Sequence, residues 1–131
     1  MKTYPLPIYV QRFFTERLAT QLRASQNTVV SYRDTFRLLL AFAGQHLKKA
    51  PSALLIKDLD IPFLGAFLDH LEKERGITAR SRNVRLAALH SFFRYVALEK
   101  PDMGGLAQRV LHQPVFQRVE ADRYQPSSRF Q

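Results

Sequence analysis

Apolar residues recur at steps of three and four along most of the chain, which is the spacing of one face of an α-helix. Four segments follow this pattern, with their repeating apolar positions inside residues 10–22, 29–47, 64–71 and 84–96. A shorter amphipathic stretch, residues 106–111, is a candidate for a fifth helix. We find no convincing strand. The pattern predicts an all-α protein, a compact bundle of four or five helices joined by short links.

The first two helices have recognisable boundaries. Pro5 and Pro7 are expected to hold the entry to the first helix extended. Either Ser25 or Asn27 can cap the second helix, which should end near residues 48–51. The inward positions expected in the first helix are Val10, Phe13, Phe14, Leu18 and Leu22.

The later helices are bounded just as clearly. Asp60 stands just ahead of a proline and is expected to cap the third helix, and Gly76 is the expected left-handed residue at its end. Thr78 or Ala79 should open the fourth helix, which the Lys100-Pro101 pair halts. The apolar link at residues 54–56 is expected to pack on the core.

Length and composition limit the number of domains. The chain has 131 residues, 46% of them hydrophobic, which is enough for one core and too few for two ordinary domains. We therefore expect one helical domain, residues 1–111. Residues 112–131 lose the helical period and become polar with proline and serine, so we expect a loose, irregular C-terminal tail.

The charge balance indicates a polyanionic partner. The chain has 20 Lys and Arg residues against 11 Asp and Glu residues, a formal charge of +9. Nucleic acid fits this excess, and so does an anionic membrane surface. No apolar run is long enough for a membrane helix, no signal peptide is recognisable, and cysteine is absent, so we expect a cytoplasmic protein without membrane attachment.

The start of the fourth helix carries the most specific chemistry. Arg80, Arg82 and Arg85 lie within about two turns of a helix N-terminus, where the helix dipole disfavours cations by roughly 0.3 to 1 kcal/mol each. Phosphate groups would reverse that preference. Ser81 can bond a phosphate, Asn83 has the geometry to read adenine, and an arginine can read guanine in the major groove. Alternatively, these arginines form a solvated face and pair with Glu72 or Glu74 of the third helix.

The second helix offers another polar surface. Asn27 and Thr28 lie at its start, and Arg33 and Arg37 follow on a face away from the apolar stripe. Contact with phosphates is plausible for these residues. The alternative for the first turn is simple helix capping.

Two segments also resemble a known family. Residues 25–42, SQNTVVSYRDTFRLLLAF, resemble the S-x-N-T-x-x-x-Y-x-x-x-L-x-x-F signature of the core-binding domain of tyrosine recombinases of the phage integrase type. Residues 78–96, TARSRNVRLAALHSFFRYV, resemble the last long helix of that domain, with R-L-x-A-L-x-S-F-F-x-Y. The resemblance implies a four-helix, SAM-like orthogonal bundle that grips duplex DNA. In that family a separate C-terminal domain performs strand exchange.

The family places its second and fourth helices towards DNA. Together with the charge pattern, this predicts a set of DNA contacts on those two helices. His90 departs from the more usual basic residue at its position, and the alternative is an ordinary surface side chain. The predicted contacts are Asn27, Thr28, Arg33, Arg37, Arg80, Ser81, Arg82, Asn83, Arg85, His90 and Arg94.

We expect no catalysis from this chain. The family's active site occupies a further large domain, for which these residues leave no room. His112, Arg118, Arg123 and Tyr124 are suggestive residue types, but they lie in the expected tail without a scaffold. The four histidines are scattered without metal-site spacing, and no cofactor or small-molecule substrate is indicated. A remnant of a mobile element, a natural truncation and an excised fragment all fit this sequence.

The main rival interpretation is a helical protein-interaction module. It would use residues 53–56 or the tail to bind a partner chain, for example a full-length recombinase that it regulates. Contacts with other recombinase protomers on DNA would make the two interpretations compatible. Salt-insensitive binding would favour the rival.

Overall fold

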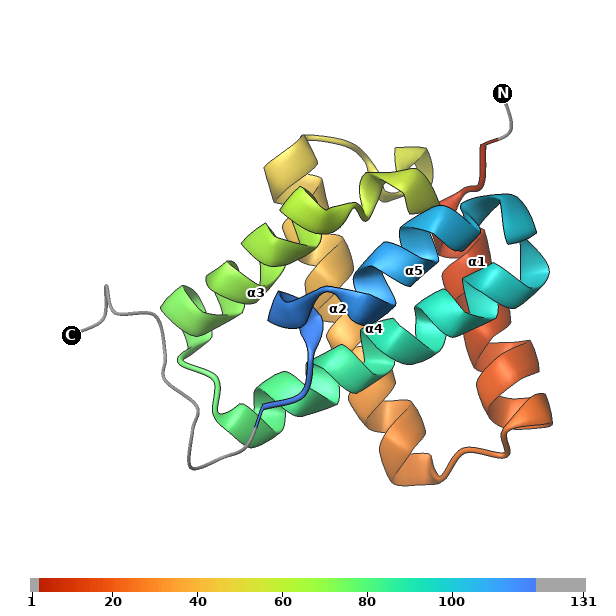
Figure 1. The fold of residues 1–131 in the computed structure, drawn as a ribbon, viewed down its shortest axis with the longest axis horizontal. Helices are drawn as coiled ribbons and strands as arrows, with labels where there is room; N and C mark the ends of the chain where they lie inside the picture. Colours follow the sequence, from red (N-terminus) through yellow and green to blue (C-terminus); the bar gives the residue numbers. More distant parts are fainter. Residues whose placement is uncertain (1–2, 120–131) are drawn as a thin grey trace.

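The computed structural model describes residues 3–119 (Figure 1). This part of the chain forms five α-helices and no β-strand, apart from an isolated bridge between Pro5 and Leu55. The all-α bundle and its fifth helix are confirmed. The α-helices are α1 (Leu6–Arg12), α2 (Gln26–Leu47), α3 (Ile61–Arg75), α4 (Ala79–Glu99) and α5 (Gly104–His112). A π-helix, Phe13–Gln21, continues α1, and short 3-10 turns cover Pro51–Ala53, Ile56–Asp58, Pro101–Met103 and Pro114–Phe116.

Three helices begin at a predicted capping residue. The Oγ atom of Ser25 accepts a hydrogen bond from the backbone N–H of Thr28 at 3.1 Å, so Ser25 rather than Asn27 caps α2. Asp60 caps α3 in the same way, at 2.9 Å, and Thr78 caps α4 at 3.0 Å. Gly76 ends α3 with φ 54°, the left-handed conformation expected there. These four boundaries follow directly from local chemistry.

The first helix differs from the prediction at both ends. Pro5 is extended, but Pro7 lies inside the first turn of α1, where a missing N–H costs nothing. At the other end the helix widens to π-helical winding, with the N–H of Leu22 bonded to the carbonyl of Arg17 at 2.8 Å. This winding turns Leu22 outward, leaving it 49% exposed, so its predicted place in the core is wrong.

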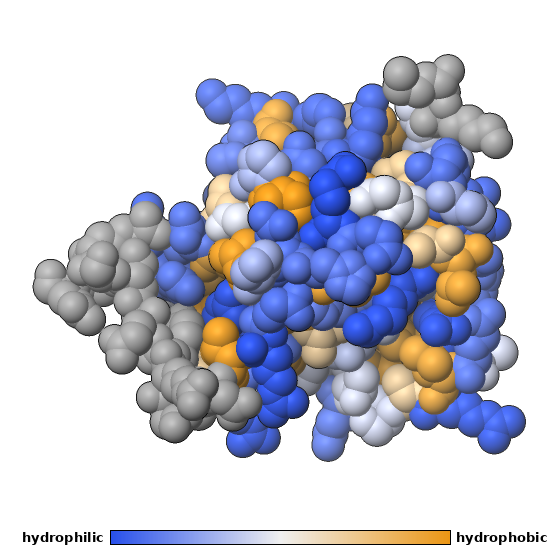
Figure 2. All heavy atoms as spheres, in the orientation of Figure 1, coloured by the Kyte–Doolittle hydropathy of each residue, from blue (hydrophilic) through white to orange (hydrophobic). Residues whose placement is uncertain are grey.

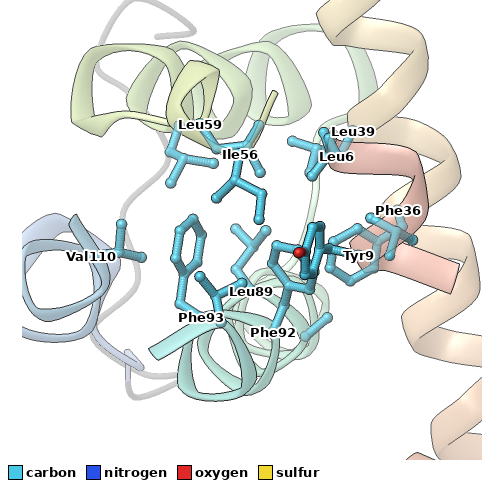
Figure 3. Close-up of a cluster of buried hydrophobic side chains, with 14 of the residues drawn as sticks. Leu6, Tyr9, Phe36, Leu39, Ile56, Leu59, Leu89, Phe92, Phe93 and Val110 are labelled. Atoms are coloured by element: carbon cyan, nitrogen blue, oxygen red, sulfur yellow. The ribbon is translucent and has the colours of Figure 1, made fainter. Parts of the chain in front are cut away.

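Helix α4 packs against both α2 and α5 and supplies Leu89, Phe92 and Phe93 to the core (Figures 1 and 3). Phe92 and Phe93 of α4 are fully buried. The ring of Phe13 lies 5.5 Å from that of Phe92 and 5.9 Å from that of Phe36 on α2, which joins the first helix to the centre. Ile56, in the apolar link before α3, is also fully buried, which confirms that this link packs on the core.

The segment after α5 turns back along the N-terminal half of α4 (Figure 1). Phe116 anchors it, with a side chain only 1% exposed. The sequence predicted a loose tail from residue 112. In its first part Phe116 is buried and the backbone of Val115, Gln117 and Val119 is hydrogen-bonded to α4, while most other side chains of residues 113–119 are exposed. Arg123 and Tyr124 lie outside the described residues.

Candidate functional site

A cavity of about 510 Å³ lies between α2 and the first turns of α4. Four arginines and a single carboxylate are among its lining residues, so its charge is strongly positive. It brings together five of the predicted contacts. Its lining residues are Val30, Ser31, Arg33, Asp34, Arg37, Thr78, Arg80, Ser81, Val84 and Arg85. We call it the arginine cavity.

Simple helix geometry assembles the arginine cavity. Arg33 and Arg37 are four residues apart, which places them on the same face of α2. Arg80 and Ser81 belong to the first turn of α4, where the helix dipole favours an anion. The side chains of Arg33, Arg37 and Arg80 are exposed to solvent. The arrangement suits an anionic ligand that approaches from outside.

Arg85 has a different environment from the other three arginines. Its guanidinium group donates to the carboxylate of Asp34 and to the hydroxyl of Thr35, both at 3.1 Å. Its side chain is 15% exposed, and Thr35 is fully buried. Arg85 therefore ties α4 to α2. The sequence left open that these arginines pair with acids of the third helix. Arg85 does not, because its partner Asp34 belongs to α2.

Arg82 is buried and faces the C-terminal segment. Its side chain donates to the backbone carbonyls of Val115 and Gln117, the latter at 3.0 Å. Only 6% of the residue is exposed. The spacing of α4 explains this, since Arg82 stands three residues after buried Ala79 and four before buried Leu86. The apolar stripe of the helix thus includes one arginine, a signal that was present in the sequence.

Asn83 faces the same segment. Its Nδ2 atom donates to the carbonyl of Val119, and its Oδ1 atom accepts from the N–H of Val119, both at 2.8 Å. The side-chain amide thereby uses its donor and its acceptor on one main-chain residue. Arg82 and Asn83 therefore direct these hydrogen-bonding groups to the protein's own backbone, and their predicted contacts with DNA stay predictions.

His90 and Arg94 line a second cavity, of about 340 Å³, farther along α4. Burial lowers the pKa of His90 below its ordinary value of 6.5, a backbone hydrogen bond at Phe116 opposes the shift, and the charges of Arg94 and His112 add to it. The Nε2 atom of His90 is buried without a hydrogen-bond partner. The lining residues are Tyr32, Asn83, Leu86, Ala87, His90, Ser91, Arg94 and Arg118.

Asn27 and Thr28 line neither cavity. Asn27 is exposed in the first turn of α2, and the hydroxyl of Thr28 accepts a hydrogen bond from Ser25 at 3.0 Å. The structure thus divides the predicted contacts into a group at the arginine cavity, a group at the second cavity, these two residues near the start of α2, and buried Arg82, which lines neither cavity.

Two functional candidates escaped the sequence reasoning. Asp34, the carboxylate of the arginine cavity, gives no signal in the sequence, because an acid on a helix face is usually solvated. Arg118 was assigned to the tail, yet it lines the second cavity. Its position depends on the long-range contacts of Arg82 and Asn83, which no local pattern reveals.

No helix in residues 3–119 is both long enough and apolar enough to cross a membrane. Nor does this range hold a group of three or more His, Cys, Asp or Glu side chains arranged to bind a metal ion.

The known proteins that the chain resembles are integrases and recombinases. Residues 11–100 match the sequence profile of the phage integrase N-terminal SAM-like domain. The chain is 52% identical over 105 residues to the integrase/recombinase y4rC of Sinorhizobium fredii, a match that covers 80% of this chain and 32% of the relative. It is 45% identical over 106 residues to y4rD of the same organism, covering 81% of this chain and 38% of the relative.

A more distant relative is the tyrosine recombinase XerC of Pelotomaculum thermopropionicum, 31% identical over 117 residues. That match covers 88% of this chain and 38% of the relative. The chain therefore spans about a third of the length of the relatives that it matches. No solved structure matches the chain.

Proposed function

Because this chain belongs to the phage integrase family, whose N-terminal SAM-like domain it contains, we propose that it binds duplex DNA through the arginine cavity between α2 and α4. The observation that carries the proposal is the convergence of exposed Arg33 and Arg37 with Arg80 at the N-terminus of α4. Helix propensity and stability do not account for a cation at that end of a helix. A phosphate backbone does, since it supplies the missing negative charge.

Each group in the cavity has a distinct role in this proposal. Arg33, Arg37 and Arg80 neutralise phosphates, because their guanidinium groups are exposed and form paired hydrogen bonds with phosphate oxygens. Ser81 donates its hydroxyl to a phosphate. Arg85 holds α2 against α4 and contributes charge from inside. Phosphate contacts fix the position of the domain on DNA, and base contacts would come from residues that the bound duplex brings within reach.

Fluorescence anisotropy of a labelled random duplex tests this proposal. Affinity should be measured between about 50 and 200 mM salt for the wild type and for a variant with Arg33→Gln, Arg37→Gln and Arg80→Gln. Each lost phosphate contact should reduce the slope of log affinity against log salt by about 0.9, so the variant should lose about two to three from the slope.

A matched control separates the site from net charge. A second triple variant, Lys57→Gln, Lys73→Gln and Arg109→Gln, removes the same charge from exposed residues that line neither cavity. It should keep a slope within about one of the wild type. Equal losses in the two variants would mean that binding follows net charge alone, and absence of wild-type binding at low salt would contradict DNA binding by this chain.

We further propose that strand cleavage is not performed by these 131 residues. The family match is to an N-terminal domain and the chain spans about a third of its relatives, which supports this division of labour. The partners proposed are then duplex DNA and other recombinase protomers bound beside it, and DNA as partner implies a cytoplasmic location. A nicking assay on supercoiled plasmid should show no cleavage.

The surface gives less support to the protein-interaction alternative. On the face drawn in Figure 2, apolar residues form separate spots among hydrophilic ones. The large exposed apolar residues come from different elements and do not include the apolar link at residues 54–56, since Leu54 and Ile56 are buried. Those exposed residues are Ile8, Leu22, Val30, Leu98 and Val115.

A further inference from the structure

Arg82 and Asn83 together form a main-chain anchor for the C-terminal segment. Arg82 holds the carbonyls of Val115 and Gln117, and Asn83 holds both the N–H and the carbonyl of Val119. All of these bonds end on backbone atoms. The anchor therefore fixes the path of residues 115–119 while leaving the side chains of that segment free to serve another purpose.

Arg118 lies between two anchored residues, Gln117 and Val119. Its own side chain is exposed and lines the second cavity. An arginine in an unanchored segment would lose substantial rotational freedom on ordering. Here the anchor has already restricted the backbone, so the backbone part of that cost is met before any ligand arrives.

Within the part of the chain that the structure describes, the second cavity collects positive charge without a matching carboxylate. Arg94 of α4 and Arg118 of the C-terminal segment face it together with His90, and no carboxylate from residues 3–119 lines it. The arginine cavity differs, because Asp34 lies within it. In the described residues neither Arg94 nor Arg118 forms an ion pair.

The polar groups around these cations fit an oxyanion. Ser91 and Tyr32 supply hydroxyl groups at the cavity wall, and the two guanidinium groups supply forked donors. The Nε2 atom of His90 is buried without a partner. Burial is the main cause of a lowered pKa at His90. A backbone hydrogen bond at Phe116 opposes this shift, and the charges of Arg94 and His112 add to it, so the charged groups that act on His90 are basic residues.

We propose that the second cavity binds a phosphodiester of the duplex backbone, with Arg94 and Arg118 as its cationic ligands. Arg82 and Asn83 are positioning residues, which act on DNA by holding Arg118 in place. This inference rests on the proposed DNA-binding function. It adds a ligand from the C-terminal segment and gives a positioning role to two residues that the sequence pattern had offered as DNA contacts.

Salt-dependent DNA binding tests the role of Arg118. Arg118→Gln should reduce the slope of log affinity against log salt by about 0.9. A fourfold rise in salt should then weaken the binding of this variant by a factor about three times smaller than for the wild type. Because Arg118 is exposed, this variant should fold normally. Arg109→Gln, an identical change at an exposed position on α5 outside both cavities, should leave the slope nearly unchanged. A slope for Arg118→Gln equal to that of the control overturns the proposal.

A double-mutant cycle tests the role of Asn83. If Asn83 acts by holding Arg118, then Asn83→Ala should weaken binding in the wild type and have little further effect in Arg118→Gln. Additive losses would show that Asn83 contacts DNA itself and would overturn the positioning role. So would a change of base preference in Asn83→Ala that Arg118→Gln does not share.

Inorganic phosphate separates the cavity from the DNA-binding function. In the full chain, titration with phosphate should move the His90 ring signals in the NMR spectrum of the wild type, and this shift should be lost in Arg118→Gln. Failure of the wild type to bind duplex would contradict the proposed function. If phosphate still moved His90 in that case, the cavity would hold a free anion, and its assignment to the DNA backbone would be overturned.

Discussion

The side-chain amide of Asn83 forms two reciprocal hydrogen bonds of 2.8 Å with the backbone of Val119, 36 residues away. This pair closes the return of the chain from α5 to the start of α4. It also brings Arg118, which the sequence placed in a loose tail, into the lining of the second cavity with His90. A polar residue near a helix N-terminus can thus hold the protein's own backbone instead of a base.

Stability should depend on this pair of bonds. Asn83→Ala removes two partly buried hydrogen bonds and leaves the N–H and carbonyl of Val119 unpaired, so the free energy of unfolding should fall by about 1 to 2 kcal/mol. Urea denaturation followed by circular dichroism measures the change. Asn27→Ala, at an exposed asparagine, should stay within about 0.5 kcal/mol of the wild type. Equal effects at the two positions would contradict the importance of the Val119 pair.

The cap of α4 should influence both stability and DNA binding. Thr78→Ala removes the acceptor for the N–H of Ser81 and should lower the free energy of unfolding by about 1 kcal/mol. The first turn, which carries Arg80, would fray and bind duplex less tightly. Thr78→Ser keeps the hydroxyl acceptor and should restore both properties in denaturation and anisotropy measurements. An unaltered Thr78→Ala protein would show that the cap is dispensable.

Asp34 should restrain DNA affinity. Its carboxylate is the negative charge in the lining of the arginine cavity, and its side chain is 49% exposed, so Asp34→Asn should cost at most about 1 kcal/mol of stability. A unit charge about 10 Å from a phosphate in water contributes about 0.4 kcal/mol, so affinity for duplex should rise about twofold or more. Anisotropy titration measures this.

The matching control is Glu74→Gln, which removes a carboxylate from the exposed part of α3 outside both cavities. It should raise affinity less than Asp34→Asn does. The reverse order would mean that DNA does not approach the arginine cavity.

Acid should destabilise the fold through His90. Burial lowers the pKa of His90 below 6.5. A hydrogen bond at Phe116 opposes the shift, and the charges of Arg94 and His112 reinforce it, so the folded state favours the neutral ring. The unfolded chain binds a proton more readily, so this stabilisation is complete above pH 6.5 and is lost as the pH falls through the lower folded value. Thermal melts between about pH 8 and 5 should show a weaker pH dependence in His90→Gln.

His46→Gln provides the comparison for that experiment, because His46 is exposed at the end of α2. Both variants are melted over the same pH range as the wild type. If His90→Gln kept the full pH dependence of the wild type, other groups would be responsible for it.

Local chemistry predicted much of the fold. Caps at Ser25, Asp60 and Thr78 and the glycine terminus at Gly76 depend on a few neighbouring residues, and all four are confirmed. Leu22 was misplaced because the helical period changes at Phe13, where π-helical winding begins, and no composition signal marks that change.

The candidate site was less predictable, because its arrangement depends on contacts between distant parts of the chain. The sequence pointed to Arg33 and Arg37, which share one face of α2 through helix geometry alone, and to Arg80 at the start of α4, which the packing of α4 on α2 brings beside them. It could not show that Arg85 reaches Asp34, 51 residues away. The spacing of apolar residues in α4 predicts a buried position for Arg82, whereas its charge predicts an exposed one. The backbone carbonyls of the returning segment make burial possible because they accept hydrogen bonds from the guanidinium group.

The main-chain anchor also affects how the C-terminal segment can change over time. Arg82 and Asn83 recognise peptide groups, which every amino acid carries, so substitutions at positions 115 and 119 leave their bonds intact unless proline removes the N–H at 119. Phe116, in contrast, must fill a buried space. The segment can therefore carry different side chains beside the second cavity without remodelling of the bundle.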